Sequence, residues 1–229
     1  MNINSSFTEY PFLTYDEFKR CVDGFEKRFG AALRADGSKS VHITGSKGSR
    51  NQYLQITTHV YKQGEEKSSS IADDIEPVED PDPARQLECH DSEACASSKA
   101  VENGWIDYHI VYSPGWRVPV LYLRMYVNDQ GEGARVVLDA SEMSDAMVKD
   151  REVKKALAAV EFGGALGVQD HPVLGHPYMY LHPCHTATLM RTVGASFSDG
   201  IGEVEYLAAW LSLVGPAVGL TLPSVPRDL

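Results

Sequence analysis

Residues 53–61 read Tyr53-Leu54-Gln55-Ile56-Thr57-Thr58-His59-Val60-Tyr61. Apolar and β-branched side chains at the even positions alternate with polar and aromatic side chains at the odd positions. A period of two in β-branched and aromatic residues predicts a half-buried β-strand. The rest of the fold can be placed around this strand.

Segments on both sides of this strand repeat its character. Residues 106–112 alternate in the same way, residues 118–127 form another long strand pattern, and residues 41–43 and 135–138 are short strand candidates. Turn residues separate these segments, notably Ser113-Pro114-Gly115 and Asn128-Asp129-Gln130-Gly131. We therefore expect an antiparallel sheet of about four strands.

Helical patterns flank the sheet. Thr14 and Glu17 have the spacing of a capping box, and apolar residues follow at helical spacing to about residue 35. Residues 141–159 and 203–214 are also typical of helices, and residues 178–181 form a short apolar run between them. A helix, an antiparallel sheet and then C-terminal helices predict an α+β fold in a single domain over residues 1–229.

Residues 64–104 differ from the rest of the chain in composition. They are rich in Ser, Asp, Glu and Pro, lack a sustained period, and hold twelve acidic and three basic residues. Such a segment buries too little apolar surface to offset its ordering entropy, so we predict an acidic disordered insertion. Its net charge of −9 accounts for most of the −11 of the whole chain.

Charge and hydropathy exclude several function classes. With 32 acidic and 21 basic residues, the chain lacks the excess of Lys and Arg that nucleic acids and anionic membranes attract. The first residues show no signal for secretion, and the apolar stretch 206–222 is too short for a membrane span and predicts a buried helix and turn. We expect a cytoplasmic protein with no integral membrane segment, no nucleic-acid partner and four free cysteines.

The densest chemistry lies between Asp170 and Thr186, where Cys184 and four histidines fall together. Three of the histidines precede prolines, which stiffen the segment. The imidazoles of His182 and His185 are close enough in sequence to favour a thiolate at Cys184 or to accept its proton. Local chemistry alone leaves a reactive cysteine and a buried, inert one as equal alternatives.

Metal binding is a rival interpretation of the same segment. Imidazole and thiolate bind zinc well, but positions 171, 176, 182, 184 and 185 match no familiar zinc motif, and the prolines oppose wrapping around an ion. We therefore expect no metal site. The chain also lacks a phosphate-binding loop and a dinucleotide fingerprint, so no cofactor is expected.

The other cysteines are weaker candidates for chemistry. Cys21 falls on the apolar side of the first predicted helix and is expected in the core. Cys89 and Cys95 lie inside the acidic segment, where solvated thiols are expected.

A family resemblance rests on two stretches, Tyr180-Leu181-His182-Pro183-Cys184-His185-Thr186 and His171-Pro172-Val173-Leu174-Gly175. Together they closely resemble the active-site signature of the ubiquitin-conjugating-enzyme-like proteins of autophagy. Of the two families in that group, the chain is more similar to the autophagy-related protein ten family. Residues 209–220 look like the C-terminal helix and turn of that family, and residues 108–122 resemble its central hairpin.

The resemblance implies a conjugating-enzyme-like fold and an acyl transfer that needs no bound cofactor. It implies that an ATP-using autophagy activating enzyme delivers a ubiquitin-like modifier, autophagy protein twelve, to Cys184 as a thioester. A lysine of the acceptor, autophagy protein five, then attacks the thioester and forms an isopeptide bond.

The group that stabilises the oxyanion is left open by the resemblance. Ordinary ubiquitin-conjugating enzymes carry a His-Pro-Asn motif before the cysteine, whereas this chain reads His176-Pro177-Tyr178. The candidate donors are His182, Thr186 and the backbone N–H groups after Cys184. The candidates for orienting the lysine are on strand 53–61, each with an exposed strand face as the alternative: Tyr53, Thr57 and His59.

Two other functions remain as alternatives. One is a hydrolase with a Cys-His pair, such as a deconjugating peptidase, which is disfavoured because no histidine follows His185. The other is a non-catalytic adaptor that has the same fold and recruits partners through its strands and its acidic segment.

Overall fold

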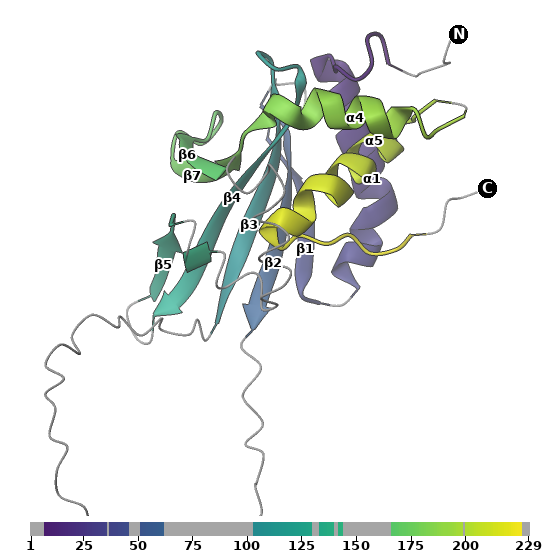
Figure 1. The fold of residues 1–229 in the computed structure, drawn as a ribbon. Helices are drawn as coiled ribbons and strands as arrows, with labels where there is room; N and C mark the ends of the chain where they lie inside the picture. Colours follow the sequence, from purple (N-terminus) through teal and green to yellow (C-terminus); the bar gives the residue numbers. More distant parts are fainter. Residues whose placement is uncertain are drawn as a thin grey trace, which may run out of the picture.

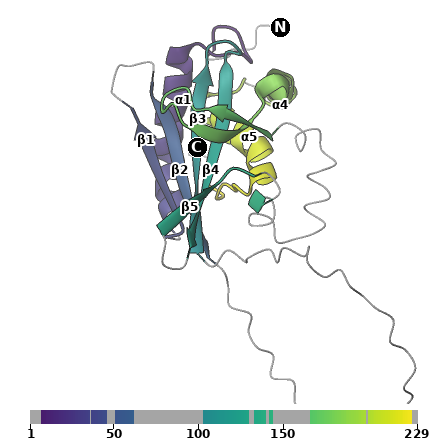
Figure 2. The same ribbon diagram turned by 90° about the vertical axis from the view of Figure 1, so that its left-hand side faces the viewer.

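The computed structural model describes residues 7–35, 37–45, 51–61, 103–129, 133–139, 142–143, 166–198 and 200–225. Within these ranges seven strands form one antiparallel sheet, and helices cover one of its faces (Figures 1 and 2). The strands are Lys39–Thr44 (β1), Tyr53–Tyr61 (β2), Asn103–Ser113 (β3), Val118–Asp129 (β4), Gly133–Val137 (β5), Leu166–Asp170 (β6) and Pro177–Leu181 (β7).

The order of the strands is β1-β2-β3-β4-β7-β6, and β5 pairs with β4 off this path. β5 lies along the C-terminal half of β4, where Met125 pairs with Val137. β7 lies along the same edge of β4 but nearer its start, where Tyr122 pairs with Tyr180. The sheet is therefore larger than the expected four strands. The short apolar runs at 41–43, 135–138 and 178–181 all pair with the long central strands.

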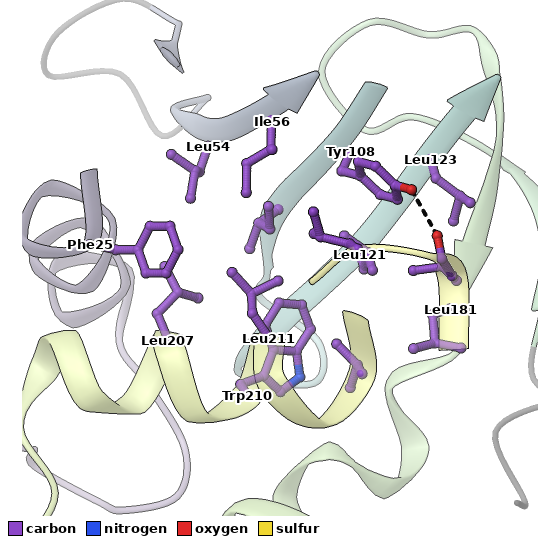
Figure 3. Packing of buried hydrophobic residues seen from close by; sticks show 14 of the residues in the cluster. Phe25, Leu54, Ile56, Tyr108, Leu121, Leu123, Leu181, Leu207, Trp210 and Leu211 are labelled. Carbon is purple, nitrogen blue, oxygen red and sulfur yellow. Dashed lines mark hydrogen bonds between the residues drawn. The ribbon is translucent and has the colours of Figure 1, made fainter. Parts of the chain in front are cut away.

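The helices are Tyr15–Arg34 (α1), Thr186–Gly194 (α4) and Glu203–Val214 (α5), with short 3₁₀ helices at Pro183–His185 (η1) and Gly215–Val218 (η2). α1 and α5 pack side by side on one face of the sheet (Figure 1). Their apolar faces meet Leu54 and Ile56 of β2 in the main core. Figure 3 shows Phe25, Leu207 and Trp210 of these helices facing residues of the sheet, among them Leu54, Ile56 and Leu121. The α+β prediction is confirmed.

The capping box at the start of α1 is confirmed. The backbone N–H of Glu17 donates to Thr14 Oγ1 at 3.3 Å, and the N–H of Thr14 donates to Glu17 Oε2 at 2.6 Å. A third donor, the N–H of Thr8, reaches Glu17 Oε1 at 2.6 Å. The carboxylate is 2% exposed, so it joins the segment before α1 to the helix from inside the protein.

The C-terminal prediction of a buried helix and turn is also confirmed, since α5 continues into η2. The hydroxyl of Tyr108 in β3 donates to the carbonyl of Val218 at 2.7 Å, which attaches η2 to the sheet (Figure 3). No helix in the described part of the chain has the length and apolar character needed to cross a membrane.

Two predicted segments fall mostly outside the described residues. Of the predicted helix 141–159, only residues 142–143 are described, and they are helical. Of the predicted insertion 64–104, only Asn103 and Gly104 are described. Both belong to β3, with Gly104 opposite Val60 of β2. The boundary at 104 is therefore wrong by two residues, because strand pairing begins before the alternating pattern becomes visible in the sequence.

Candidate active site

Cys184 is exposed at the point where the sheet passes into the last helices. β7 ends at Leu181, His182 is the N-cap of η1, and α4 begins at Thr186. Pro183 occupies the first position of η1, where its missing N–H is not needed and its fixed φ suits a helical turn. Cys21, in contrast, is fully buried in the main core, as expected. Of these two free cysteines, Cys184 alone is open to a macromolecular substrate.

The His182 side chain is tied to the backbone of the nucleophile candidate. Its Nδ1 accepts a hydrogen bond from the backbone N–H of Cys184 at 3.2 Å. Because Nδ1 is an acceptor, a neutral His182 carries its proton on Nε2. The same hydrogen bond occupies the N–H of Cys184, and the N–H of Thr186 donates to the carbonyl of Pro183. Both of these backbone groups are therefore already bonded within the protein.

Thr186 lies next to Cys184 in sequence but on the inside of the fold. It is 4% exposed and opens α4, whereas Cys184 and His185 are exposed. A carbonyl that reacts with the exposed thiol would lie at the surface. The buried position of Thr186 therefore suits the packing of α4 better than contact with such a substrate.

A histidine–tyrosine cluster, made of Tyr53, His109, Tyr122, His171 and Tyr178, lies on the face of the sheet opposite α1 and α5. His109 and His171 are 2% and 1% exposed, and His109 Nδ1 lies 3.2 Å from His171 Nε2. His171 Nδ1 accepts the backbone N–H groups of Val173 and Leu174, both at 3.2 Å.

These contacts determine the tautomers. Since Nδ1 of His171 accepts, its proton is on Nε2 and is donated to Nδ1 of His109. The proton of His109 is then on its own Nε2, which is buried and has no hydrogen-bond partner among the described residues.

Both buried imidazoles are neutral at ordinary pH. Burial lowers the pKa of His109 to about 3, and repulsion by His171 adds to the effect. Burial likewise lowers the pKa of His171 to about 4. The pair therefore acts as a neutral hydrogen-bonded support. It holds the loop after β6 against the sheet, and this loop leads directly into β7 and Cys184.

The three candidates on β2 occupy different surroundings. Tyr53 is 3% exposed and its ring centroid is 5.2 Å from that of His171, so it supports the cluster. Thr57 donates its hydroxyl to Asp107 Oδ1 at 2.6 Å. His59 pairs with Trp105 in the neighbouring strand.

The strand register separates two of these residues from the thiol. Thr57 is level with Arg124 of β4, and His59 is level with Tyr126. Tyr180 is level with Tyr122, and the chain runs from there to Cys184 in the direction of decreasing β4 numbers. Cys184 thus lies toward the β3–β4 turn, whereas Thr57 is level with the middle of β4 and His59 lies toward the end of β4 that is farther from this turn. The fold does not bring them together.

Two residues near the site had not been singled out from the sequence. His109 sits at an outward-facing strand position beside Asp107, a pattern typical of a solvated face. Trp116 lies in the β3–β4 turn and contacts His182 edge to face, with ring centroids 5.3 Å apart. A large aromatic residue directly after Ser113-Pro114-Gly115 is unusual in a turn and was the available signal. In the described ranges, no group of three or more His, Cys, Asp and Glu side chains is placed to hold a metal ion.

Comparison with known proteins places this site in a family. A family model described as "Autophagocytosis associated protein, active-site domain" matches residues 17–225. "Ubiquitin-like-conjugating enzyme ATG10" of Homo sapiens is 34% identical over 136 residues, which cover 59% of this chain and 57% of that protein. The protein of the same name from Arabidopsis thaliana is 34% identical over 125 residues, covering 53% and 52%. The chain therefore spans about half the length of the curated relatives it matches.

A solved structure titled "Crystal structure of Autophagic E2, Atg10" aligns with a TM-score of 0.48 and 12% identity, over 91% of this chain and 97% of that chain. The matched range includes the sheet, the histidine–tyrosine cluster and Cys184. The chain belongs to the family of autophagocytosis-associated proteins that share this active-site domain.

Proposed function

We propose that this protein is a conjugating enzyme of autophagy that carries a ubiquitin-like modifier as a thioester on Cys184 and transfers it to a lysine of an acceptor protein. The observation that carries the proposal is the exposed thiol of Cys184, at the junction of β7 and η1, within a family described by its active-site domain. Relatives named ubiquitin-like-conjugating enzymes support the same reaction class.

The proposed partners follow from the resemblance of the motif around Cys184. An autophagy activating enzyme uses ATP to load the modifier, autophagy protein twelve, and the acceptor is autophagy protein five. The Cys184 thiolate attacks the thioester held by the activating enzyme. A new C–S bond forms on Cys184, the C–S bond to the activating enzyme breaks, and the cysteine of that enzyme leaves as the thiolate.

Transfer to the acceptor is the second acyl transfer. The lysine amine attacks the carbonyl carbon of the thioester, the C–N bond of the isopeptide forms, and the C–S bond breaks with Cys184 leaving as the thiolate. The amine proton passes to solvent or to a base on the acceptor. Because a thiolate leaves more readily than an alkoxide or an amide nitrogen, a cysteine suits this role. A reduced thiol is required, which favours the cytoplasm as the compartment.

His182 is the proposed oxyanion donor. Its Nδ1 is occupied by the N–H of Cys184, so the proton on Nε2 is the one available to a substrate oxygen. Of the competing candidates, Thr186 is less suitable, because its side chain is buried and its backbone N–H is already bonded to the carbonyl of Pro183. The backbone N–H of His185 stays an alternative donor. A donor aimed at the developing negative charge typically accelerates acyl transfer by about 10²–10³-fold.

The test is formation of a covalent adduct. The protein is mixed with the autophagy activating enzyme, ATP and the modifier, and the products are separated on non-reducing gels. We expect an adduct that disappears with a thiol reductant, and that becomes resistant to reductant in Cys184→Ser because an oxyester forms. Cys21→Ala is the matched control, since its thiol is buried, and it should still be charged.

The other outcomes separate the competing functions. An adduct that persists in Cys184→Ala contradicts the assignment of the nucleophile. Cleavage of a fluorogenic modifier conjugate without ATP would establish a hydrolase instead. If the protein shows neither adduct formation nor cleavage, the adaptor alternative is the one supported. Loss of the folded state on chelation would indicate a structural metal.

A further inference from the structure

Trp116 is an exposed aromatic residue that contacts His182, two residues before the candidate nucleophile. It is 48% exposed, one of four large hydrophobic residues at the surface of the described ranges, with Val168, Leu174 and Leu213. Its ring meets the ring of His182 at an interplanar angle of 78°, with centroids 5.3 Å apart. An edge-to-face arrangement at this separation is attractive. The indole therefore restrains the imidazole that caps η1.

The turn that carries Trp116 is held in an uncommon backbone conformation. Arg117 has φ of +54°, a left-handed value that is unfavourable for a residue with a side chain. Within the turn, the N–H of Arg117 donates to the carbonyl of Ser113 at 2.7 Å. The backbone directly after Trp116 thus has a defined conformation, closed by a hydrogen bond within the turn.

Contacts from the N-terminal segment stabilise this turn from outside. The N–H of Leu13 donates to the carbonyl of Arg117 at 2.7 Å. The Arg117 guanidinium lies 5.5 Å from the ring centroid of Phe12 and pairs with Glu9 at 2.8 Å. The segment before α1 therefore contacts both the backbone carbonyl and the guanidinium of Arg117, and these contacts hold the turn against the rest of the protein. Contacts of this kind restrict the motion of the turn and so of the exposed Trp116 indole that it carries.

We propose that Trp116 is a positioning residue for acyl transfer, which holds the His182 ring so that Nδ1 stays bonded to the N–H of Cys184 while the protonated Nε2 faces the reacting carbonyl. This role rests on the proposed function for its catalytic consequence. The contact between the two rings and its effect on the Cys184 amide can be measured on the isolated protein, whether or not the proposed function is correct. Without the indole, the imidazole gains rotational freedom about its side-chain torsions, and the geometry at Cys184 loosens.

The test measures the protein alone and then the reaction. In Trp116→Ala the amide hydrogen of Cys184 should exchange with solvent about fivefold faster, as expected from the loss of one aromatic pair. Trp116→Phe restores an aromatic ring and should stay within about twofold of the parent protein. Trp105→Ala is the matched control. Trp105 stacks on Tyr126 at the other end of the sheet, so the Cys184 amide should be unaffected.

The second measurement is single-turnover discharge of the thioester, preformed on Cys184, to the acceptor protein. Trp116→Ala should slow discharge about fivefold, and Trp116→Phe should recover most of the rate. The inference is overturned if amide exchange at Cys184 is unchanged in Trp116→Ala, or if Trp116→Phe is as impaired as Trp116→Ala. If the parent protein forms no thioester, the proposed function fails, while the exchange measurement still decides whether Trp116 positions His182.

Discussion

Acidification from pH 7 to pH 5 should destabilise the fold by about 4 kcal/mol through His109 and His171. Both imidazoles are buried and neutral, with pKa values of about 3 and about 4. In the unfolded chain each would titrate near pH 6.5. Between pH 6.5 and pH 4 the unfolded state therefore binds more protons than the folded state. The stabilisation is complete above pH 6.5 and is lost as the pH falls toward the folded values.

The magnitude follows from proton linkage. At pH 5 an unfolded histidine is almost fully protonated, whereas neither buried histidine is, so each contributes about 2 kcal/mol between pH 7 and pH 5. Two such groups are enough to remove a large part of the ~5–15 kcal/mol by which domains are usually stable.

Urea denaturation at pH 7 and pH 5, followed by tryptophan fluorescence and circular dichroism, gives the two free energies of unfolding. In His171→Gln the pH-dependent loss should fall to about half. The exposed His176→Gln is the control and should keep the loss of the parent protein. The reasoning is refuted if the parent protein loses less than about 1 kcal/mol, or if NMR shows His109 titrating near pH 6.5.

Three further predictions concern other parts of the molecule. Burial alone would raise the pKa of Glu17, but hydrogen bonds from Thr14 and Thr8 outweigh it and lower the pKa to about 2. Glu17→Gln should therefore cost about 3 kcal/mol at pH 7, measured by denaturation, and this cost should roughly halve by pH 3 as the carboxylate loses its advantage. His182→Ala should slow thioester discharge about a hundredfold with unchanged circular dichroism, whereas His182→Gln, which keeps an N–H donor, should be less impaired. Gly215→Ala should destabilise by about 1–3 kcal/mol, because the new Cβ would lie 2.4 Å from the Leu220 carbonyl oxygen, while Gly115→Ala meets open space and should be neutral in the same denaturation assay.

Local patterns predicted the elements of the fold more successfully than their pairing. The N-cap of α1 at Thr14 and the extent of β2 were predictable because capping and alternation depend on residues close in sequence. β6 was not predicted, since Leu166-Gly167-Val168-Gln169-Asp170 has little alternation and its burial is slight. Its place depends on pairing with β7, which is a tertiary contact.

The same distinction applies to the candidate site. Cys184 was predictable because its motif is contiguous in sequence. The importance of His109 was not, because the residue that buries it, His171, lies 62 positions away in the chain. Thr57 and His59 share a strand with Tyr53 and face the same way, but their register levels, at Arg124 and Tyr126 of β4, lie away from the end of the sheet that leads to the thiol. The alternating pattern of a strand predicts which face of the sheet a side chain lies on. It does not predict how far along that face the side chain lies from the site.

The short ladder between β4 and β7 has a consequence for local unfolding. β7 is joined to β4 by two register pairs, Tyr122 with Tyr180 and Leu123 with Met179, whereas β3 and β4 share ten. Strands with few cross-strand hydrogen bonds open at lower free energy than the global transition. The hairpin of β6 and β7 should thus form its own cooperative unit, whose amides lose protection while β3 and β4 remain closed. Cys184 follows this hairpin by three residues, in η1, so a partner protein that docks there would stabilise the hairpin more than the rest of the sheet.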